Sequence, residues 1–262
     1  MIPKIIHYCW FGRGGYPESV LKCIESWKKY CPDYEIIEWN EDNFDVNYND
    51  FTKEAYEAQR YAFVSDVARL YALTQYGGVY VDTDVEIIRP LDDKILCYKG
   101  VTCFQSEANV VATAFMTAEK GLPIYLEFLS QYDGIHFLNS DGSCNWVTNN
   151  NLMTAKCLEY GLIQNNRRQE IKDLVIFPRE YFSPKNPITK ELNITNCTYV
   201  IHHFDGSWYS DIRDYKDKLR KKYKFLPQKL INFIAYTKLR GLRASVRAAN
   251  RWVKEKIKSK AS

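Results

Sequence analysis

The chain has 262 residues, 46% of them hydrophobic and 26% charged, with a formal net charge of +4 at pH 7. This length and balance suit a globular protein with one large α/β domain, or with one domain and an appendage. The apolar stretch that follows Met1 is too short and too interrupted for a signal peptide or a membrane span. The eight cysteines form no CxxC pair and no spaced ligand set, so we expect reduced thiols in a cytoplasmic protein.

The N-terminal part of the chain has the pattern of a parallel α/β unit. Lys4 to Trp10 predicts a buried strand that ends in a glycine-rich loop. Three apolar residues follow at helical spacing, namely Val20, Ile24 and Trp27. A short strand is then predicted from Tyr34 to Trp39. This order of strand, loop, helix and strand favours an open, mostly parallel sheet.

The middle of the chain predicts one long helix followed by strands. Phe51 to Tyr76 combines good helix formers with apolar residues at helical spacing, and a Gly-Gly pair ends the helix. Val79 to Val81 then predicts a buried strand. The remaining predicted elements are a strand from Val110 to Met116, a helix from Leu122 to Tyr132, a polar loop from Asn139 to Asn151 and a late strand from Tyr199 to Phe204.

Two aspartates directly after the strand Val79–Val81 carry the clearest chemical signal. Residues i and i+2 of an extended chain point to the same side, so Asp82 and Asp84 can converge on one ion. Carboxylate oxygens suit Mg²⁺ or Mn²⁺ and leave coordination positions for phosphate oxygens. The alternative is that the two aspartates only end the strand at a turn. Open α/β sheets bind ligands at the carboxyl ends of their strands, which favours a metal site.

Two further groups of residues are candidates for the same site. Asp66 and Arg69 share one face of the preceding helix, where they form either an ordinary surface ion pair or a pair that binds sugar hydroxyls. His203 in the late strand is a reasonable third ligand for Mn²⁺, although an isolated histidine is more often structural. His202 precedes it, so the sequence leaves open which of the two histidines faces the ion.

Four segments together resemble the DXD-containing family 32 glycosyltransferases. They are Phe63 to Leu70 (FVSDVARL), Gly77 to Asp84 (GGVYVDTD), Ile2 to Gly12 (IPKIIHYCWFG) and His202 to Trp208 (HHFDGSW). That family includes bacterial capsular and exopolysaccharide sugar transferases and the yeast outer-chain mannosyltransferases, and it is similar to the catalytic domains of the large clostridial glucosylating toxins. The motifs are specific in combination, whereas a DXD motif alone is a weak signal.

The resemblance implies a GT-A fold over residues 1–212, with a single open, mostly parallel sheet and flanking helices. It implies a nucleotide-sugar donor, with a uridine diphosphate sugar as the first choice and guanosine diphosphate mannose as the second. It also implies a divalent ion, Mn²⁺ or Mg²⁺, and transfer with retention of configuration. The implied acceptor is a glycan or a lipid-linked glycan, in the synthesis of a capsular or other surface polysaccharide.

The resemblance assigns roles to individual residues as well. Asp82 and Asp84 would contact the ribose and the metal ion, and His203 would complete the metal site. Asp66 and Arg69 would hold hydroxyls of the donor sugar. Further donor contacts are implied for His7, Trp10, Gly12, Tyr80, Thr83, Gly206, Ser207 and Trp208. Asn149 and Asn150 stand where the family has small residues and a proline, and they are the candidates for positioning the acceptor in a same-face attack.

The C-terminal part differs in composition from the rest of the chain. From Arg213 onward there are 17 Lys and Arg against 3 Asp and Glu, whereas residues 1–212 hold 19 against 29. Apolar residues are interspersed with the basic ones, which predicts a basic helical extension over residues 213–262. Such a helix either lies on the inner face of the plasma membrane as a peripheral contact or packs on the domain as a solvated appendage. No recognition motif accompanies the charge, so we expect no nucleic-acid partner.

Two other functions fit parts of the sequence. The apolar strand followed by Asp82-Thr83-Asp84-Val85 also suits a phosphohydrolase whose first aspartate is the nucleophile, but that chemistry needs a further acidic pair on a later strand, which the sequence lacks. The 20 Tyr and 6 Trp also suit a carbohydrate-binding protein. Such a protein does not need a metal site built from distant segments. A metal-dependent glycosyltransferase is therefore the preferred hypothesis.

Overall fold

The structure is a computed structural model that describes residues 1–105, 110–187 and 189–205, together with Leu219 and Ile231. The helices and strands given below all lie in the unit Met1–Asp205. The predicted basic extension lies almost entirely outside the described residues. The extension, its boundary at residue 213 and its membrane contact therefore stay predictions.

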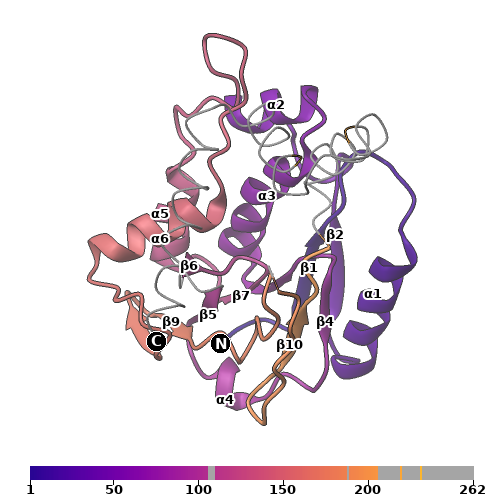
Figure 1. The fold of residues 1–262 in the computed structure, drawn as a ribbon, viewed down its shortest axis with the longest axis vertical. Helices are drawn as coiled ribbons and strands as arrows, with labels where there is room; N and C mark the ends of the chain where they lie inside the picture. Colours follow the sequence, from indigo (N-terminus) through magenta and orange to yellow (C-terminus); the bar gives the residue numbers. More distant parts are fainter. Residues whose placement is uncertain (106–109, 188, 206–218, 220–230, 232–262) are drawn as a thin grey trace. The chain divides into compact units, whose positions relative to one another are not determined.

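A mixed sheet forms the centre of the described unit (Figure 1). In spatial order its strands are β2 (Glu35–Trp39), β1 (Ile5–Cys9), β3 (Gly78–Val81), β7 (Phe115–Ala118), β5 (Gly100–Gln105), β9 (Leu174–Phe177) and β8 (Gln169–Ile171). The pairs β2–β1, β1–β3 and β5–β9 are parallel, and the pairs β3–β7, β7–β5 and β9–β8 are antiparallel. In this order of strands, β7 and β8 run antiparallel to the other five. The prediction of an open, mostly parallel α/β sheet is confirmed.

Two hydrophobic clusters cover opposite faces of this sheet. Successive residues of a strand point to opposite faces, so Tyr80 packs in one cluster and its neighbours Val79 and Val81 pack in the other. The first cluster also contains residues of α2 (Asp50–Glu57), α3 (Tyr61–Tyr76), α5 (Pro123–Ser130) and α6 (Asn149–Glu159). The second contains residues of α1 (Glu18–Tyr30), α4 (Asp93–Leu96) and the small antiparallel sheet of β4 (Val85–Ile87) with β10 (Val200–His202). No helix in the described part of the chain is both long enough and apolar enough to cross a membrane.

Two predicted elements are each divided in the structure. The predicted helix Phe51–Tyr76 forms α2 and α3, because Gln59 between them has a φ of 56°, in the left-handed region that ends a helix. The predicted strand Val110–Met116 forms β6 (Val110–Val111), which pairs with β5, and the beginning of β7. Between β6 and β7, the Thr102 hydroxyl lies 2.7 Å from the main-chain oxygen of Ala112, which satisfies a group that the interrupted ladder leaves unpaired.

The connection from α3 to β3 is a tight turn, and it determines how close α3 lies to the end of β3. Gly77 and Gly78 have φ values of 71° and 102°, which favour glycine. A Cβ atom on Gly78 would lie 2.7 Å from the main-chain oxygen of Ile5, and one on Gly77 would lie 2.6 Å from the Lys120 nitrogen. The predicted helix end at this pair is confirmed, and α3 consequently passes close to the strand that ends in the DXD sequence.

Candidate functional site

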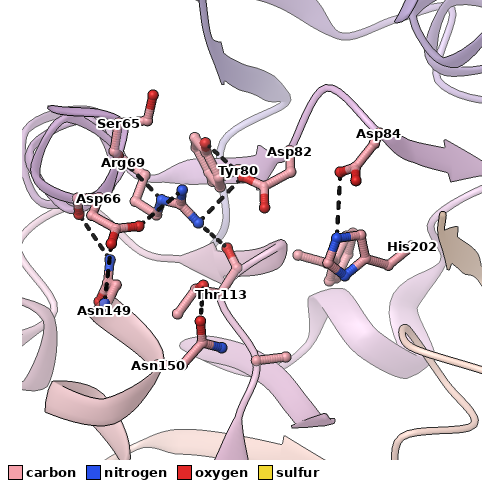
Figure 2. A network of polar contacts seen from close by, with 12 residues as sticks. Ser65, Asp66, Arg69, Tyr80, Asp82, Asp84, Thr113, Asn149, Asn150 and His202 are labelled. Atoms are coloured by element: carbon pink, nitrogen blue, oxygen red, sulfur yellow. Dashed lines mark hydrogen bonds and ion pairs between the residues drawn. The ribbon is translucent and has the colours of Figure 1, made fainter. Parts of the chain in front are cut away.

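Three charged side chains are linked at the carboxyl end of β3 (Figure 2). Asp82 directly follows the strand, and Arg69 reaches it from α3, with Nη1 of Arg69 3.2 Å from Oδ1 of Asp82. Nη2 of the same arginine lies 3.1 Å from Oδ1 of Asp66. One guanidinium thus joins two carboxylates. The Asp66–Arg69 pair is therefore no ordinary surface ion pair, because the residue Arg69 is only 5% exposed.

The surroundings of Arg69 compensate the cost of burying its charge. Its Nε donates to the main-chain oxygen of Ser65 at 3.1 Å, and its Nη1 donates to that of Thr113 at 3.0 Å. The guanidinium carbon lies 4.7 Å from the centre of the Tyr80 ring, a cation–π distance. A buried charge is tolerated only when it is paired and hydrogen-bonded in this way. These contacts make Arg69 the residue that holds the two aspartates in place.

Asp66 is fixed from a second side by Asn149, the first residue of α6. The Asn149 main-chain nitrogen donates to Oδ2 of Asp66 at 3.1 Å, and its side-chain Nδ2 donates to the Asp66 main-chain oxygen at 2.8 Å. The N-terminus of a helix favours negative charge, so α6 helps to hold the carboxylate. Burial nevertheless raises the pKa of Asp66 from 3.8 to about 6, although Arg69 and the Asn149 N–H act in the opposite direction.

The raised pKa of Asp66 predicts a specific dependence of stability on pH. Between about pH 4 and pH 6 the folded chain binds more protons at Asp66 than the unfolded chain, so the free energy of unfolding falls as the pH rises through this window. The shift of about two pH units corresponds to roughly 3 kcal/mol. Asp66→Asn cannot titrate at this position. Urea unfolding from about pH 4 to about pH 7 should therefore show the wild type losing roughly 3 kcal/mol more than the variant, and parallel curves would contradict the assignment.

Tyr80 and Cys9 lie beneath the charged groups. Tyr80 is 1% exposed, and its hydroxyl donates to Oδ1 of Asp82 at 2.9 Å. The resemblance placed Tyr80 against the nucleotide, whereas the structure packs its ring under Arg69 because residues of β3 alternate between the two cores. Burial raises the pKa of the Cys9 thiol to about 12, so this thiol is neutral at physiological pH and is no candidate nucleophile.

Asp84 and His202 lie on the opposite side of Asp82 from Arg69 (Figure 2). Nε2 of His202 is 3.3 Å from Oδ1 of Asp84. One carboxylate oxygen each of Asp82 and Asp84 and one ring nitrogen of His202 all lie within 4.8 Å of one another. Burial alone would raise the pKa of Asp84, but His202 and the Asp205 N–H outweigh it and lower this pKa from 3.8 to about 2. Asp84 is therefore ionised at physiological pH.

The histidine in this cluster is His202 rather than His203. Adjacent residues of an extended segment point to opposite sides, so only one of the two can face Asp84. Nε2 of His203 lies 2.9 Å from Oε2 of Glu86, and the His203 N–H donates to the main-chain oxygen of Asp84. The placement of His203 beside the two aspartates is thus corrected to His202, a choice that the sequence had left open.

The cluster of Asp82, Asp84 and His202 suits a divalent ion. Two carboxylates and one imidazole form a mixed oxygen and nitrogen donor set that fits Mn²⁺. The contacts from Tyr80 and Arg69 both go to Oδ1 of Asp82, and its second oxygen, Oδ2, makes neither of them. Nδ1 of His202 is buried and has no hydrogen-bond partner in the described part of the chain. A bound ligand is one physical explanation for such an atom.

His7, which the resemblance placed at the donor, is a core residue. It is completely buried; its Nε2 lies 2.8 Å from the main-chain oxygen of Gly77, and its Nδ1 accepts from Trp39 Nε1 at 3.1 Å. Burial lowers the pKa of His7 to about 4, against the effect of the Gly77 oxygen. Because both ring nitrogens are used inside the core, the donor contact predicted for His7 is not supported by its position.

The loop after β1, which carries Trp10 and Gly12, lies beside a small hollow of about 230 Å³. Its lining residues are Trp10, Arg13, Gly14, Gly15, Tyr16, Glu38, Asn40 and Glu41. The Trp10 and Tyr16 rings lie 5.0 Å apart at this hollow. Gly12 has a φ of 91°, and a Cβ atom there would lie 2.3 Å from the Tyr61 ring, so the fold requires glycine at this position.

The other predicted residues divide into two groups. Thr83 is half-buried between the two aspartates, and Asn150 bonds to neighbouring chain segments, with its Nδ2 donating to the Val111 oxygen at 2.8 Å. Gly206, Ser207 and Trp208 lie outside the described residues. No sequence pattern marks Thr113 as part of the site, because it accepts the hydrogen bond from Arg69 through its main-chain oxygen.

A larger hollow of about 690 Å³ lies away from the aspartates, along α2 and the polar loop before α6. Its lining residues are Glu54, Gly134, Ile135, His136, Leu138, Asn139, Ser140 and Asn145. The groups in it are already paired within the chain, since Nδ1 of His136 lies 2.7 Å from Oε1 of Glu54. Its size alone therefore does not make it the site of chemistry.

A protein-family model described as "Glycosyltransferase sugar-binding region containing DXD motif" matches residues 17–101. This segment contains the linked residues Asp66, Arg69 and Asp82, and it also contains Asp84. Over this segment the chain is similar to the DXD glycosyltransferases. Membership of family 32 stays a prediction.

Two curated proteins from other organisms are similar to this chain. Inositol phosphoceramide mannosyltransferase 3 of Schizosaccharomyces pombe is 30% identical over 131 residues, which cover 48% of this chain and 36% of that protein. An uncharacterized glycosyltransferase of Acanthamoeba polyphaga mimivirus is 24% identical over 246 residues, which cover 85% of this chain and 90% of the viral protein. The solved structure of PaToxG glycosyltransferase is 19% identical, with a TM-score of 0.45 over 60% of this chain and 69% of that one.

Proposed function

We propose that this chain is a DXD glycosyltransferase, which moves a sugar from a nucleotide-sugar donor to a glycan acceptor with a divalent ion held by Asp82, Asp84 and His202. The observation that carries the proposal is the convergence of these three side chains at the carboxyl end of β3, from segments far apart in the sequence. The carboxyl end of a strand is where an open α/β sheet binds its ligand. A merely structural turn would not need a histidine from β10 beside the two aspartates.

In this proposal the chain binds and orients the donor, and the ion, when bound, stabilises the charge that develops on the leaving diphosphate. Asp66, held by Arg69 and Asn149, offers a carboxylate of fixed orientation to the sugar hydroxyls. Trp10 and Tyr16, beside the small hollow after β1, offer aromatic surface to the nucleoside.

Transfer with retention then proceeds by same-face attack of the acceptor hydroxyl. Cys9 is neutral and buried, and Oδ1 of Asp82 is engaged by Tyr80 and Arg69. These two groups are thus poorly suited to form a covalent intermediate, which also argues against a phosphohydrolase with Asp82 as the nucleophile. The proposal predicts that no glycosyl-enzyme is trapped during turnover.

Several finer points of the proposal rest on the resemblance. They are a uridine diphosphate sugar as the donor, Mn²⁺ as the ion, and an acceptor in the synthesis of a capsular or other surface polysaccharide. A cytoplasmic location, expected from the cysteine pattern, and a peripheral membrane contact, expected from the basic composition of residues 213–262, are further parts of the proposal. Each of these points is independent of the metal site, so an error in one of them would leave the proposed metal site unaffected.

The proposal is tested with a panel of nucleotide sugars incubated with Mn²⁺, Mg²⁺ or EDTA. We expect release of nucleoside diphosphate from one donor with Mn²⁺, at a slow rate because water replaces the acceptor inefficiently. With EDTA we expect no release. A simple phosphate ester serves as the comparison substrate. Metal-dependent hydrolysis of that ester without turnover of any sugar donor would overturn the proposal and favour a phosphohydrolase.

His202 and His203 provide a matched pair of variants for the metal site. His202→Gln should weaken Mn²⁺ binding by at least about 10-fold, since even residues that only support a metal ligand change the affinity by about 10- to 100-fold. His203→Gln should leave the affinity near that of the wild type, because its imidazole pairs with Glu86. Calorimetric titration with Mn²⁺ measures both. The reverse order of effects would show that His203 is the ligand.

A further inference from the structure

The chain segment that follows β10 wraps around Asp84. The His203 N–H donates to the main-chain oxygen of Asp84 at 2.9 Å, and the Asp205 N–H donates to Oδ2 of Asp84 at 2.9 Å. Nε2 of His202 lies 3.3 Å from the other carboxylate oxygen, Oδ1. The main-chain oxygen and both carboxylate oxygens of Asp84 are thus each in contact with His202 or with the segment that follows it. The orientation of the Asp84 side chain therefore depends on the conformation of this segment.

The segment that follows β10 includes a residue with a strained backbone conformation. Phe204 has a φ of 56°, in the left-handed region that a bulky side chain rarely adopts. Its ring lies over the His202 ring, with centroids 3.8 Å apart and planes inclined by 32°. A left-handed residue of this kind persists only when its surroundings hold it, and such residues cluster at functional sites.

Lys190, from a distant loop, contacts this strained residue directly. Its Nζ donates to the main-chain oxygen of Phe204 at 3.0 Å and lies 5.9 Å from the centre of the Phe204 ring. The loop itself presents the lysine, because the Lys190 N–H donates to the Asn186 oxygen at 3.0 Å and Lys185 forms a β-bridge with Leu192.

One peptide group therefore connects Lys190 to Asp84. The carbonyl of the Phe204–Asp205 peptide accepts from the lysine ammonium, and the N–H of the same peptide donates to Oδ2 of Asp84. Hydrogen bonds in a chain polarise one another, so a cation on the carbonyl strengthens the donation from the N–H. Lys190 thereby stabilises both the left-handed turn and the hydrogen bond that orients the carboxylate.

We propose that Lys190 is a positioning residue for Asp84 and His202, acting through the Phe204–Asp205 peptide and the Phe204 ring. This inference rests on the proposed function, in which Asp84 and His202 hold a divalent ion. Residues that orient the ligands of a metal ion affect its affinity by about 10- to 100-fold. Lys190 is exposed, and its contacts with this segment go to Phe204 rather than to the cluster itself, so its loss should change the affinity and spare the fold.

The test measures Mn²⁺ binding to the full chain by electron paramagnetic resonance of free Mn²⁺. Lys190→Met keeps the length of the stem but removes the charge and the donor, and it should weaken Mn²⁺ binding about 10-fold. Lys190→Arg should restore most of the affinity. Lys185→Met, in the same loop, is the control and should bind as the wild type does. The thermal midpoint of each variant should stay close to that of the wild type.

The outcomes separate this inference from the proposed function. Equal affinities for the wild type and Lys190→Met would overturn the role of Lys190 and leave the metal site intact. Equal losses in Lys190→Met and Lys185→Met would also overturn it, because they would indicate a general effect of loop charge. A wild type that binds no Mn²⁺ would instead contradict the proposed function itself.

Discussion

Replacing Asp84 by asparagine should lower metal-dependent release of nucleoside diphosphate by about 100-fold or more. The side chain keeps its size but loses the negative charge that pairs with His202 and that would hold the ion. Stabilising the charge on a leaving group through a metal ion is worth several kcal/mol, and each 1.4 kcal/mol is about tenfold in rate. Initial rates with the donor identified in the panel measure the effect directly.

Glu86→Gln is the matched control for Asp84→Asn. Glu86 lies two residues further on, in β4, and pairs with His203 on the other side of the segment. Its loss removes a nearby negative charge without touching the cluster of Asp82, Asp84 and His202. We expect it to keep a rate near that of the wild type. Equal losses of activity in Asp84→Asn and Glu86→Gln would show a general effect of local negative charge and would contradict the role of Asp84 as a metal ligand.

Arg69→Met should produce the largest loss of stability among single changes at this site. It leaves the carboxylates of Asp66 and Asp82 close together with no cation between them. Removing one partner of a buried ion pair costs about 3–5 kcal/mol, because the remaining charge stays uncompensated. The thermal midpoint should therefore fall by roughly 10 °C for a domain of this size. Calorimetry or circular dichroism of the purified variant checks this value.

Two comparisons make the Arg69 prediction specific. Arg13→Met removes an exposed arginine that pairs with Asp42, and it should change stability little because solvent screens that pair. The double variant Asp66→Asn with Arg69→Met should be more stable than Arg69→Met alone, since one of the two opposed charges is gone. A loss of stability equal to that of Arg13→Met would show that the buried arrangement contributes nothing.

The sheet and the DXD position could be predicted because the residues around them follow simple patterns. Apolar strands, a Gly-Gly pair at the helix end and aspartates at a strand end are local signals, and the structure reproduces them. The break at Gln59 could not be predicted, because no glycine or proline marks it and the residue adopts a left-handed conformation in its tertiary setting.

Within the candidate site, spacing predicted that Asp66 and Arg69 share a helix face and that Asp82 and Asp84 converge. Joining the two pairs depended on their order in the chain and on the family resemblance. The choice between His202 and His203 depends on which face of β10 meets β4, a register that the sequence does not reveal. The resemblance assigned His7 to the donor, but its ring nitrogens are used by Gly77 and Trp39, which only the packed core brings to it.

The central claim is that the chain binds the donor diphosphate through an ion held by Asp82, Asp84 and His202. Titration calorimetry of the wild type with uridine and guanosine diphosphate, in Mn²⁺ and in EDTA, tests it most directly. We predict binding of at least one nucleoside diphosphate in Mn²⁺ and a loss of most of that affinity in EDTA. Equal affinity under both conditions would contradict the claim.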